Sequence, residues 1–136
     1  MITRNQIIYE AKKWLNTPFH HQASSKNLGC DCIGLIIGVA AELGIGFFHN
    51  LLPQNYDYFQ DRSYLIHCLK SYLKPGIRQL GSIALIGAEH IGWHMGFINR
   101  EHENKFTWIH SCMKQGKVIE QRFFEGAFYF DFLNIE

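Results

Sequence analysis

The pattern of hydrophobic and polar positions differs between the two halves of the chain, and the first half has the spacing of helices. Apolar residues recur at helical spacing between Ile7 and Leu15. Thr3 precedes this segment with Gln6 three residues further on, a spacing typical of a capping box. Pro18 follows it, so the pattern predicts a first helix that ends before this proline.

A second helix is predicted over residues 32–43, where the sequence is apolar almost all the way round. Asp31 is a good N-cap before this segment and Gly44 a good stop after it, so the helix is expected to be buried. A third helix is predicted over residues 60–73, with its apolar residues on one face and Pro75 shortly after its end.

After Gly81 the apolar period shortens to that of strands. The predicted strands are residues 82–86, 94–99, 106–111, 118–122 and 127–133. Helices followed by a strand meander indicate an α+β fold with a five-stranded antiparallel sheet. No repeat or linker-like tract divides the chain, so residues 1–136 are interpreted as a single domain.

Composition excludes several classes of protein. The 136 residues are 47% hydrophobic and 18% charged, which is typical of a globular chain and not of a disordered one. The net charge of +1 provides no large positive field, so no nucleic-acid partner is expected. The N-terminus lacks the pattern of a secretory signal, and no apolar stretch reaches the roughly 20 residues of a bilayer span. We therefore expect cytoplasmic synthesis and no membrane insertion.

Four cysteines and eight histidines point to catalysis or metal binding. Without a signal peptide, a disulfide scaffold is not expected. Cys30 with Cys32, or His90 with His94, superficially resemble pairs of zinc ligands, but C-x-C is tighter than the usual zinc knuckle. We predict a site without metal, and a zinc-binding module stays an alternative.

Cys32 is the candidate nucleophile, because it is expected just inside the first turn of the buried second helix. There, unpaired backbone N–H groups and the helix dipole favour the thiolate, which is the reactive form. An activated Cys32 is then expected to react with iodoacetamide well below about pH 8.5. The alternative is that Cys32 is a small buried hydrophobic residue.

A cysteine nucleophile needs a base, and two histidines occur on neighbouring predicted strands. His94 begins one strand and His110 lies near the end of the next. An antiparallel register that opposes His94 to His110 places both on one face of the sheet, with residues 100–104 as the connecting loop. A shift of one residue would put them on opposite faces, so this register is allowed and not required.

Five segments of the sequence form a recognisable order: residues 14–24, residues 29–35 with the core Asp31-Cys32-Ile33-Gly34-Leu35, residues 94–98, residues 108–111 and residues 116–120. This order resembles the NlpC-type cell-wall cysteine peptidases, and most of all their phage-encoded branch. The resemblance implies a papain-like fold, in which the helix that begins at the nucleophile packs on the antiparallel sheet. It also implies a Cys-His-His triad, with Cys32 as nucleophile, His94 as general base and His110 as the third residue, which orients the base.

The same resemblance implies an activity. Peptidases of this type hydrolyse an amide bond in peptidoglycan stem peptides, typically between the side-chain carboxyl of D-glutamate and the diamino acid, and they need no cofactor. We therefore expect a thiol protease of a phage or prophage tail, which the virion carries to the cell wall. The expected partners are the stem peptide and phage tail proteins. A cytoplasmic enzyme that acts on imported wall fragments fits the absence of a signal equally.

Two positions depart from the family pattern. Phe19 stands where a tyrosine is common, so a phenol hydroxyl is missing from the site. Gly81-Ser82 stands where a Gly-Asp pair often begins the first strand, which affects a turn. The expected substrate contacts are Phe19, Asp31 and Trp93.

Three alternatives stay open at this point. The missing hydroxyl at Phe19 motivates a catalytically weak or inactive tail-assembly protein that uses the same fold for docking. Acyl transfer to an amine in place of water would use the same site. Cys30 could replace Cys32 as the nucleophile, although the Asp-Cys-x-Gly-Leu match favours Cys32.

Overall fold

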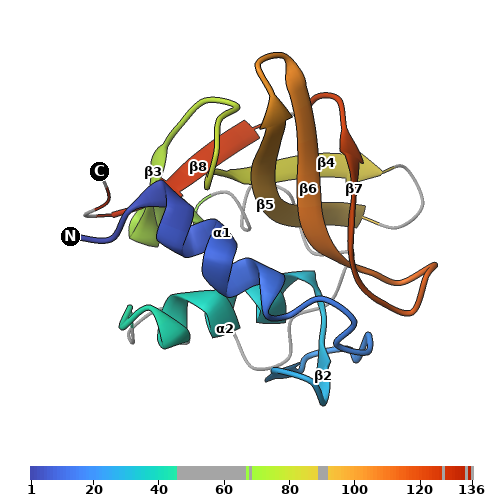
Figure 1. The fold of residues 1–136 in the computed structure, drawn as a ribbon. Helices are drawn as coiled ribbons and strands as arrows, with labels where there is room; N and C mark the ends of the chain where they lie inside the picture. The colour runs from blue at the N-terminus through green and yellow to red at the C-terminus, as the bar shows by residue number, and fades with distance from the viewer. Residues whose placement is uncertain (46–66, 68, 89–91, 127, 134, 136) are drawn as a thin grey trace.

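The computed structural model describes residues 1–45, 67, 69–88, 92–126, 128–133 and 135. Helices α1 and α2 precede a large sheet in the chain, and a short two-stranded ribbon lies between the two helices (Figure 1). The elements are α1 (Arg4–Lys12), β1 (Ser24–Ser25), β2 (Gly29–Cys30), α2 (Cys32–Glu42), β3 (Leu73–Pro75), β4 (Ile83–Ala88), β5 (Gly92–His102), β6 (Lys105–Cys112), β7 (Lys117–Phe123) and β8 (Phe128–Phe132).

Helix α1 begins with the predicted capping box. The Thr3 hydroxyl accepts the backbone N–H of Gln6 at 3.1 Å, and the Gln6 side chain accepts the backbone N–H of Thr3 at 2.8 Å. The helix ends at Lys12, earlier than predicted, because the next residues tighten into turns that lead to Asn16 at φ 72°. Trp14 lies in these turns and is still buried, which explains why the helical pattern extends past the helix.

Helix α2 confirms the second predicted helix and its caps. The Asp31 side chain accepts the backbone N–H of Gly34 at 2.7 Å. Gly44 follows the helix at φ +84°, the left-handed conformation that glycine adopts without strain. Most of the helix is buried, as its apolar sequence predicts.

The third predicted helix falls mainly outside the described residues. Residues 67 and 69–72 are helical, in agreement with the prediction. Leu73 was expected to be the last helical residue, and this is wrong, because it begins strand β3 and pairs with Phe132 of β8. The buried side chain of Leu73 fits either structure, so the local sequence does not distinguish them.

The main sheet is antiparallel throughout, with the strand order β3-β8-β4-β5-β6-β7. Strands β4 to β8 match the five predicted runs, so the α+β fold is confirmed. Among the described residues the sheet has six strands and not five, because β3 adds to the edge formed by β8. Its three residues are too short to show a strand pattern in the sequence.

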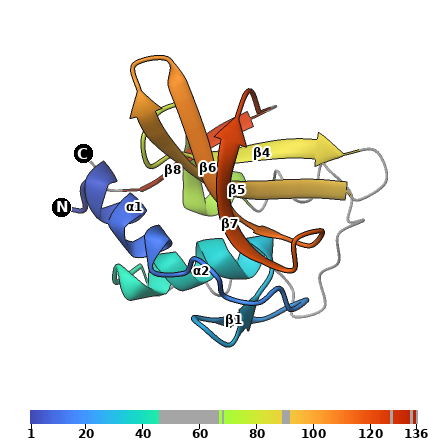
Figure 2. The ribbon, with the colours of Figure 1, turned by 45° about the vertical axis from the view of Figure 1, so that its right-hand side comes forward.

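The two faces of the sheet are covered differently. Helices α1 and α2 pack on one face, where they form the main hydrophobic core with residues such as Met95, Phe97 and Ile109 (Figures 1 and 2). A smaller cluster lies on the opposite face and contains Ala84, Ile98, Trp108 and Phe123. Side chains of β5 therefore alternate between a helix-covered face and a face without these helices.

A buried polar cluster ties the first helix to the last strand. Arg4 donates two hydrogen bonds to the carboxylate of Asp131, both at 3.0 Å, and the Ser82 hydroxyl donates a third at 2.6 Å. Ile2 and Ile135 form an isolated parallel bridge beside it. Within the described part of the chain, none of the helices has the length and apolar character needed to cross a membrane.

Candidate active site

The site is built on β5 and β6, whose register differs from the expected one. Phe97 pairs with Ile109, whereas direct opposition of His94 and His110 would pair Phe97 with Thr107. The strands continue to the pair of His102 and Lys105, with an irregularity in register before it, so the connecting loop is shorter than predicted. The register is shifted by two residues, which is an even number, so His94 and His110 still share one face.

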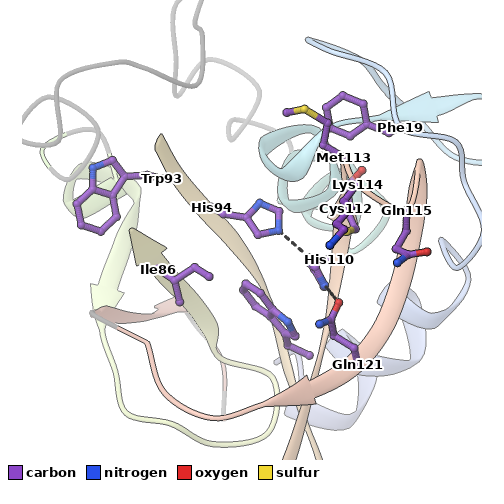
Figure 3. Close-up of a pocket in the computed structure, with 12 residues that line it drawn as sticks. Phe19, Ile86, Trp93, His94, His110, Cys112, Met113, Lys114, Gln115 and Gln121 are labelled. Carbon is purple, nitrogen blue, oxygen red and sulfur yellow. Dashed lines mark hydrogen bonds between the residues drawn. The ribbon is translucent and has the colours of Figure 1, made fainter. Parts of the chain in front are cut away.

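His94 and His110 form the central contact of this face. The Nε2 atom of His94 lies 2.6 Å from Nδ1 of His110. On its other side, Nε2 of His110 lies 2.8 Å from Oε1 of Gln121, on strand β7. Figure 3 shows these side chains as a continuous chain of hydrogen bonds from β5 across β6 to β7.

Trp108 supports both imidazoles. Its ring stacks on His110, with ring centroids 4.4 Å apart, and meets the ring of His94 edge-on at 5.2 Å. Neither Trp108 nor Gln121 is among the functional residues predicted from the sequence. The alternation of side chains along a strand could have indicated them. Trp108 lies two residues from His110 and so points to the same face, and it pairs with Gln121 on the neighbouring strand.

Gly96 provides the space for this arrangement. A Cβ atom at Gly96 would lie 2.7 Å from the carbonyl oxygen of Ile109 and 2.8 Å from the side chains of His110 and Trp108. Any larger residue at this position would push β6 or its aromatic side chains away from β5. The imidazole pair thus depends on a glycine between His94 and Ile98.

Both imidazoles are held neutral at pH 7. Burial, together with a smaller effect of the neighbouring His110, lowers the pKa of His94 to about 3. Burial also lowers the pKa of His110, against the opposing effect of its hydrogen bond to Gln121. A neutral imidazole has a lone pair that can accept a proton, but a pKa of about 3 makes His94 a weak base in this state, and general-base catalysis near pH 7 requires a higher pKa.

Cys32 lies at the first residue of α2, as predicted, and its side chain is almost fully buried. The expectation of a lowered pKa is wrong for this state, because burial raises the pKa of Cys32 to about 12. The negative charge of Asp31 raises the pKa as well, and hydrogen bonds from the backbone N–H groups of Met95, Ile33 and Cys32 itself offset only part of the increase. Cys32 is therefore a neutral thiol here.

The structure brings Cys32 to the strand of His94 and not to its imidazole. The backbone N–H of Met95, the residue after His94, contacts the sulfur of Cys32. Cys32 and Met95 belong to the helix-covered core, whereas the His94 ring lies against Trp108 on the other face. Among the described residues no hydrogen bond joins Cys32 to His94, and Cys32 is not one of the side chains that line the cavity next to His94.

The other cysteines have different surroundings. Cys30 is fully buried, and burial raises its pKa to about 11. The Ser111 hydroxyl donates to the carbonyl oxygen of Cys30 at 2.7 Å, which fixes the backbone before α2. Cys112 lines the cavity described below. Cys30, Cys32 and Cys112 are all free thiols.

A cavity of about 410 Å³ opens on the imidazole side (Figure 3). His94, His110 and Gln121 line it, together with Phe19 and Trp93, two of the three expected substrate contacts. This volume lies in the range of typical small-molecule sites, roughly 300–1,000 Å³. Its walls are mainly apolar and aromatic, with Lys114 as the charged residue among the side chains that line it.

Asp31, the third expected substrate contact, is fully buried outside this cavity. One carboxylate oxygen caps Gly34, and the other accepts the backbone N–H of Gln22 at 2.7 Å. In this structure the residue therefore holds the loop before α2 against the helix start. His21 lies 3.9 Å from the same carboxylate.

No group of three or more metal-ligating side chains is found among the described residues. His90, part of the zinc alternative, lies outside them. Nε2 of His94 and Nδ1 of His110 are engaged in the hydrogen bond between the two rings.

Comparison with solved structures identifies the fold. The chain is similar to the NlpC/p60 domain of the peptidoglycan hydrolase SagA, with a TM-score of 0.62 over 96% of this chain and 99% of that one. Sequence identity between the two is 16%. No protein-family profile matches this chain, and no curated protein matches it in sequence. The structural similarity confirms the expected papain-like α+β fold.

Proposed function

We propose that this chain is a cysteine peptidase that cleaves peptidoglycan stem peptides. The observation that carries the proposal is the hydrogen-bonded pair of His94 and His110 at a cavity, one residue from the amide that contacts Cys32. The similarity to a peptidoglycan hydrolase domain supports the choice of substrate. Cys32 would be the nucleophile, His94 the general base and His110 the residue that orients it.

The proposed reaction begins with a proton transfer. His94 takes the proton of the Cys32 thiol, and the sulfur attacks the carbonyl carbon of the scissile amide. Backbone N–H groups at the start of α2, including that of Cys32, stabilise the oxyanion of the tetrahedral intermediate. The amine leaves with the proton from His94, and water then hydrolyses the thioester.

The neutral, buried state of Cys32 adds one requirement. Because Cys32 is a buried neutral thiol and no hydrogen bond joins it to His94 among the described residues, we propose that the productive complex differs from the described state by a movement of side chains around His94. Substrate binding in the cavity next to Trp93 and Phe19 would accompany this movement. The thiolate would then form only when a substrate is present, which protects it from other reactions.

The proposed function also includes which amide bond is cleaved and where the protein acts. We propose the amide between the γ-carboxyl of D-glutamate and the diamino acid, and a role in the tail of a phage or prophage. Lys114 at the cavity supports a substrate that carries carboxylates, as stem peptides do. Delivery by a virion would bring such an enzyme to the cell wall.

Mass spectrometry of stem-peptide fragments tests this proposal. The wild type should cleave, Cys32→Ala should fold normally and lose all hydrolysis, and Cys30→Ala should retain most of it. The product masses identify the bond. Equal activity of the two variants would contradict Cys32 as nucleophile, and added amines that appear in the products would assign acyl transfer in place of hydrolysis.

A second candidate function is a tail-assembly protein that uses this fold for docking. Two observations favour it: Phe19 lines the cavity without a hydroxyl, and the cavity wall does not include Cys32. The same experiment separates the two functions, since a docking protein would leave the fragments intact with the wild type as well as with Cys32→Ala.

A further inference from the structure

We propose that Gln121 is a positioning residue that sets the tautomers of both histidines and so leaves Nδ1 of His94 free to accept a proton. This inference rests on the proposed function. Gln121 lies on β7, two strands away from His94, and reaches it only through His110. It touches neither Cys32 nor His94.

The side-chain amide of Gln121 determines which ring nitrogen of His110 carries a proton. Its Oε1 atom, 2.8 Å from Nε2 of His110, is a carbonyl oxygen and can only accept a hydrogen bond. His110 must therefore carry its proton on Nε2. In a neutral imidazole only one nitrogen carries a proton, so Nδ1 of His110 has a lone pair.

The tautomer of His110 in turn determines the tautomer of His94. The lone pair on Nδ1 of His110 faces Nε2 of His94 at 2.6 Å, so Nε2 of His94 must donate. The proton of His94 is then on Nε2, and its Nδ1 is unprotonated. Nδ1 is the atom that can take the proton from the Cys32 thiol, which converts His94 to an imidazolium and the thiol to a thiolate.

The reversed arrangement would block the base. If the NH₂ group of Gln121 donated to Nε2 of His110, Nδ1 of His110 would carry the proton and donate to Nε2 of His94. Nδ1 of His94 would then be protonated and could accept nothing. One amide, two strands away, thus decides whether the general base is available.

Burial makes the constraint effective. His110 is 4% exposed, and Trp108 stacks on its ring, so water has little access to replace the amide as its partner. Both imidazoles are neutral in this environment, so protonation does not override the choice of tautomer. Gln121 itself is exposed at the edge of the sheet, so its replacement changes the hydrogen bond with little effect on the core.

Nitrogen-15 NMR of the histidine rings tests the inference directly, because protonated and unprotonated ring nitrogens have distinct shifts. In the wild type, His94 and His110 should each carry the proton on Nε2. Gln121→Glu, whose carboxylate can only accept, should keep both tautomers, and Gln121→Met should give a mixture. Glu120→Gln, on the same strand with its contacts to Thr107 and Asn99, is the matched control and should change neither ring.

Kinetics provides the second readout. Gln121→Met should lower kcat about tenfold or more with little change in KM, and Gln121→Glu should restore most of the loss. A proton on Nδ1 of His94 in the wild type, or unchanged tautomers in Gln121→Met, would overturn the inference. Failure of the proposed function is a separate result: the wild type would cleave no stem peptide while its tautomers stay as expected.

Discussion

The two halves of the proposed catalytic pair, Cys32 and His94, are held in different ways. Cys32 is packed in the hydrophobic core, and its partners are backbone N–H groups. His94 lines a cavity, and its partners are the side chains of His110 and, through it, Gln121. The thiol is positioned by the fold itself, whereas the imidazole is positioned by side chains.

The surroundings of Cys32 show why a cysteine at the start of a helix is not always a reactive thiolate. The dipole of α2 and three N–H groups favour the thiolate of Cys32, but burial and the charge of Asp31 oppose them and prevail. A helix N-terminus contributes about 0.3–1 kcal/mol in exposed sites, and desolvation of a fully buried group exceeds this several times. A cysteine at a helix start is therefore activated only where a cation or solvent reaches it.

Alanine substitutions of the glycines next to Cys32 and His94 should lower the free energy of unfolding by different amounts. These are the largest effects of substitutions that we expect. An alanine at Gly34, on the thiol side, would place its Cβ 1.8 Å from the carbonyl oxygen of Ala23, whereas the closest atom at Gly96 is 2.7 Å away. Gly34→Ala should lower the free energy of unfolding by about 3 kcal/mol or more, and Gly96→Ala by about 1–3 kcal/mol. Urea denaturation measures both.

Gly87→Ala is the matched control for these variants. Its Cβ would meet only the side chain of Trp93, at 3.1 Å, and this side chain can move. The order of destabilisation should therefore be Gly34, then Gly96, then Gly87. If Gly34→Ala were as stable as Gly87→Ala, the backbone contact at the start of α2 would be described wrongly.

Asp31→Asn should separate stability from thiol reactivity on the helix side. Asparagine keeps one acceptor for Gly34 but cannot accept the N–H of Gln22, so stability should fall by about 1–2 kcal/mol. Loss of the negative charge should lower the pKa of Cys32 from its raised value. Urea unfolding and the rate of iodoacetamide alkylation at alkaline pH measure the two effects.

The control for Asp31→Asn is Glu42→Gln, which removes an acidic charge at the other end of α2. Glu42 contacts Lys26 at 3.6 Å on the surface and caps nothing. It should change neither quantity by much. Slower alkylation of Asp31→Asn than of the wild type would contradict the role of the carboxylate in raising the pKa.

The pH dependence of stability should also differ between the two groups, with an acid limb for His94 and an alkaline limb for Cys32. Because the pKa of His94 is lowered to about 3, the unfolded chain binds a proton below about pH 6.5 that the folded chain does not. Stability should therefore fall as the pH decreases from about 6.5 towards 3, by about 1.4 kcal/mol per pH unit for one such group. His94→Gln should flatten this acid limb, as followed by urea midpoints.

Cys32 should produce the opposite pH dependence, a loss of stability as the pH increases. The raised pKa of Cys32, about 12 against an ordinary 9.0, means that the unfolded chain loses a proton first as the pH increases. Stability should fall above about pH 9, with a contribution from Cys30 as well. Cys32→Ala should weaken this alkaline limb and leave the acid limb unchanged, whereas His94→Gln should do the reverse.

Local patterns predicted most of the fold. The capping box at Thr3, the cap at Asp31 and five of the six strands of the main sheet are each encoded within a few residues. Strand β3 could not be predicted in this way, because it exists through pairing with β8, far away in the sequence. The exact register of β5 and β6 was missed because the irregularity between Arg100 and His102 leaves no mark in the pattern.

The candidate site was predicted in part. Strand parity correctly placed His94 and His110 on one face, since any even shift of register preserves it. The raised pKa of Cys32 could not be predicted, because the sequence indicates the helix start but not the depth of burial. Gln121 was missed because its importance comes from a partner on the neighbouring strand and not from its own neighbours in the chain.

The link between Arg4 and Asp131 affects how the structure opens locally. The bridge between Ile2 and Ile135 and the two bonds of Arg4 join segments that are far apart in the sequence. Helix α1 and strand β8 are therefore expected to unfold together, as one cooperative unit, and their backbone amides should show similar protection in hydrogen exchange.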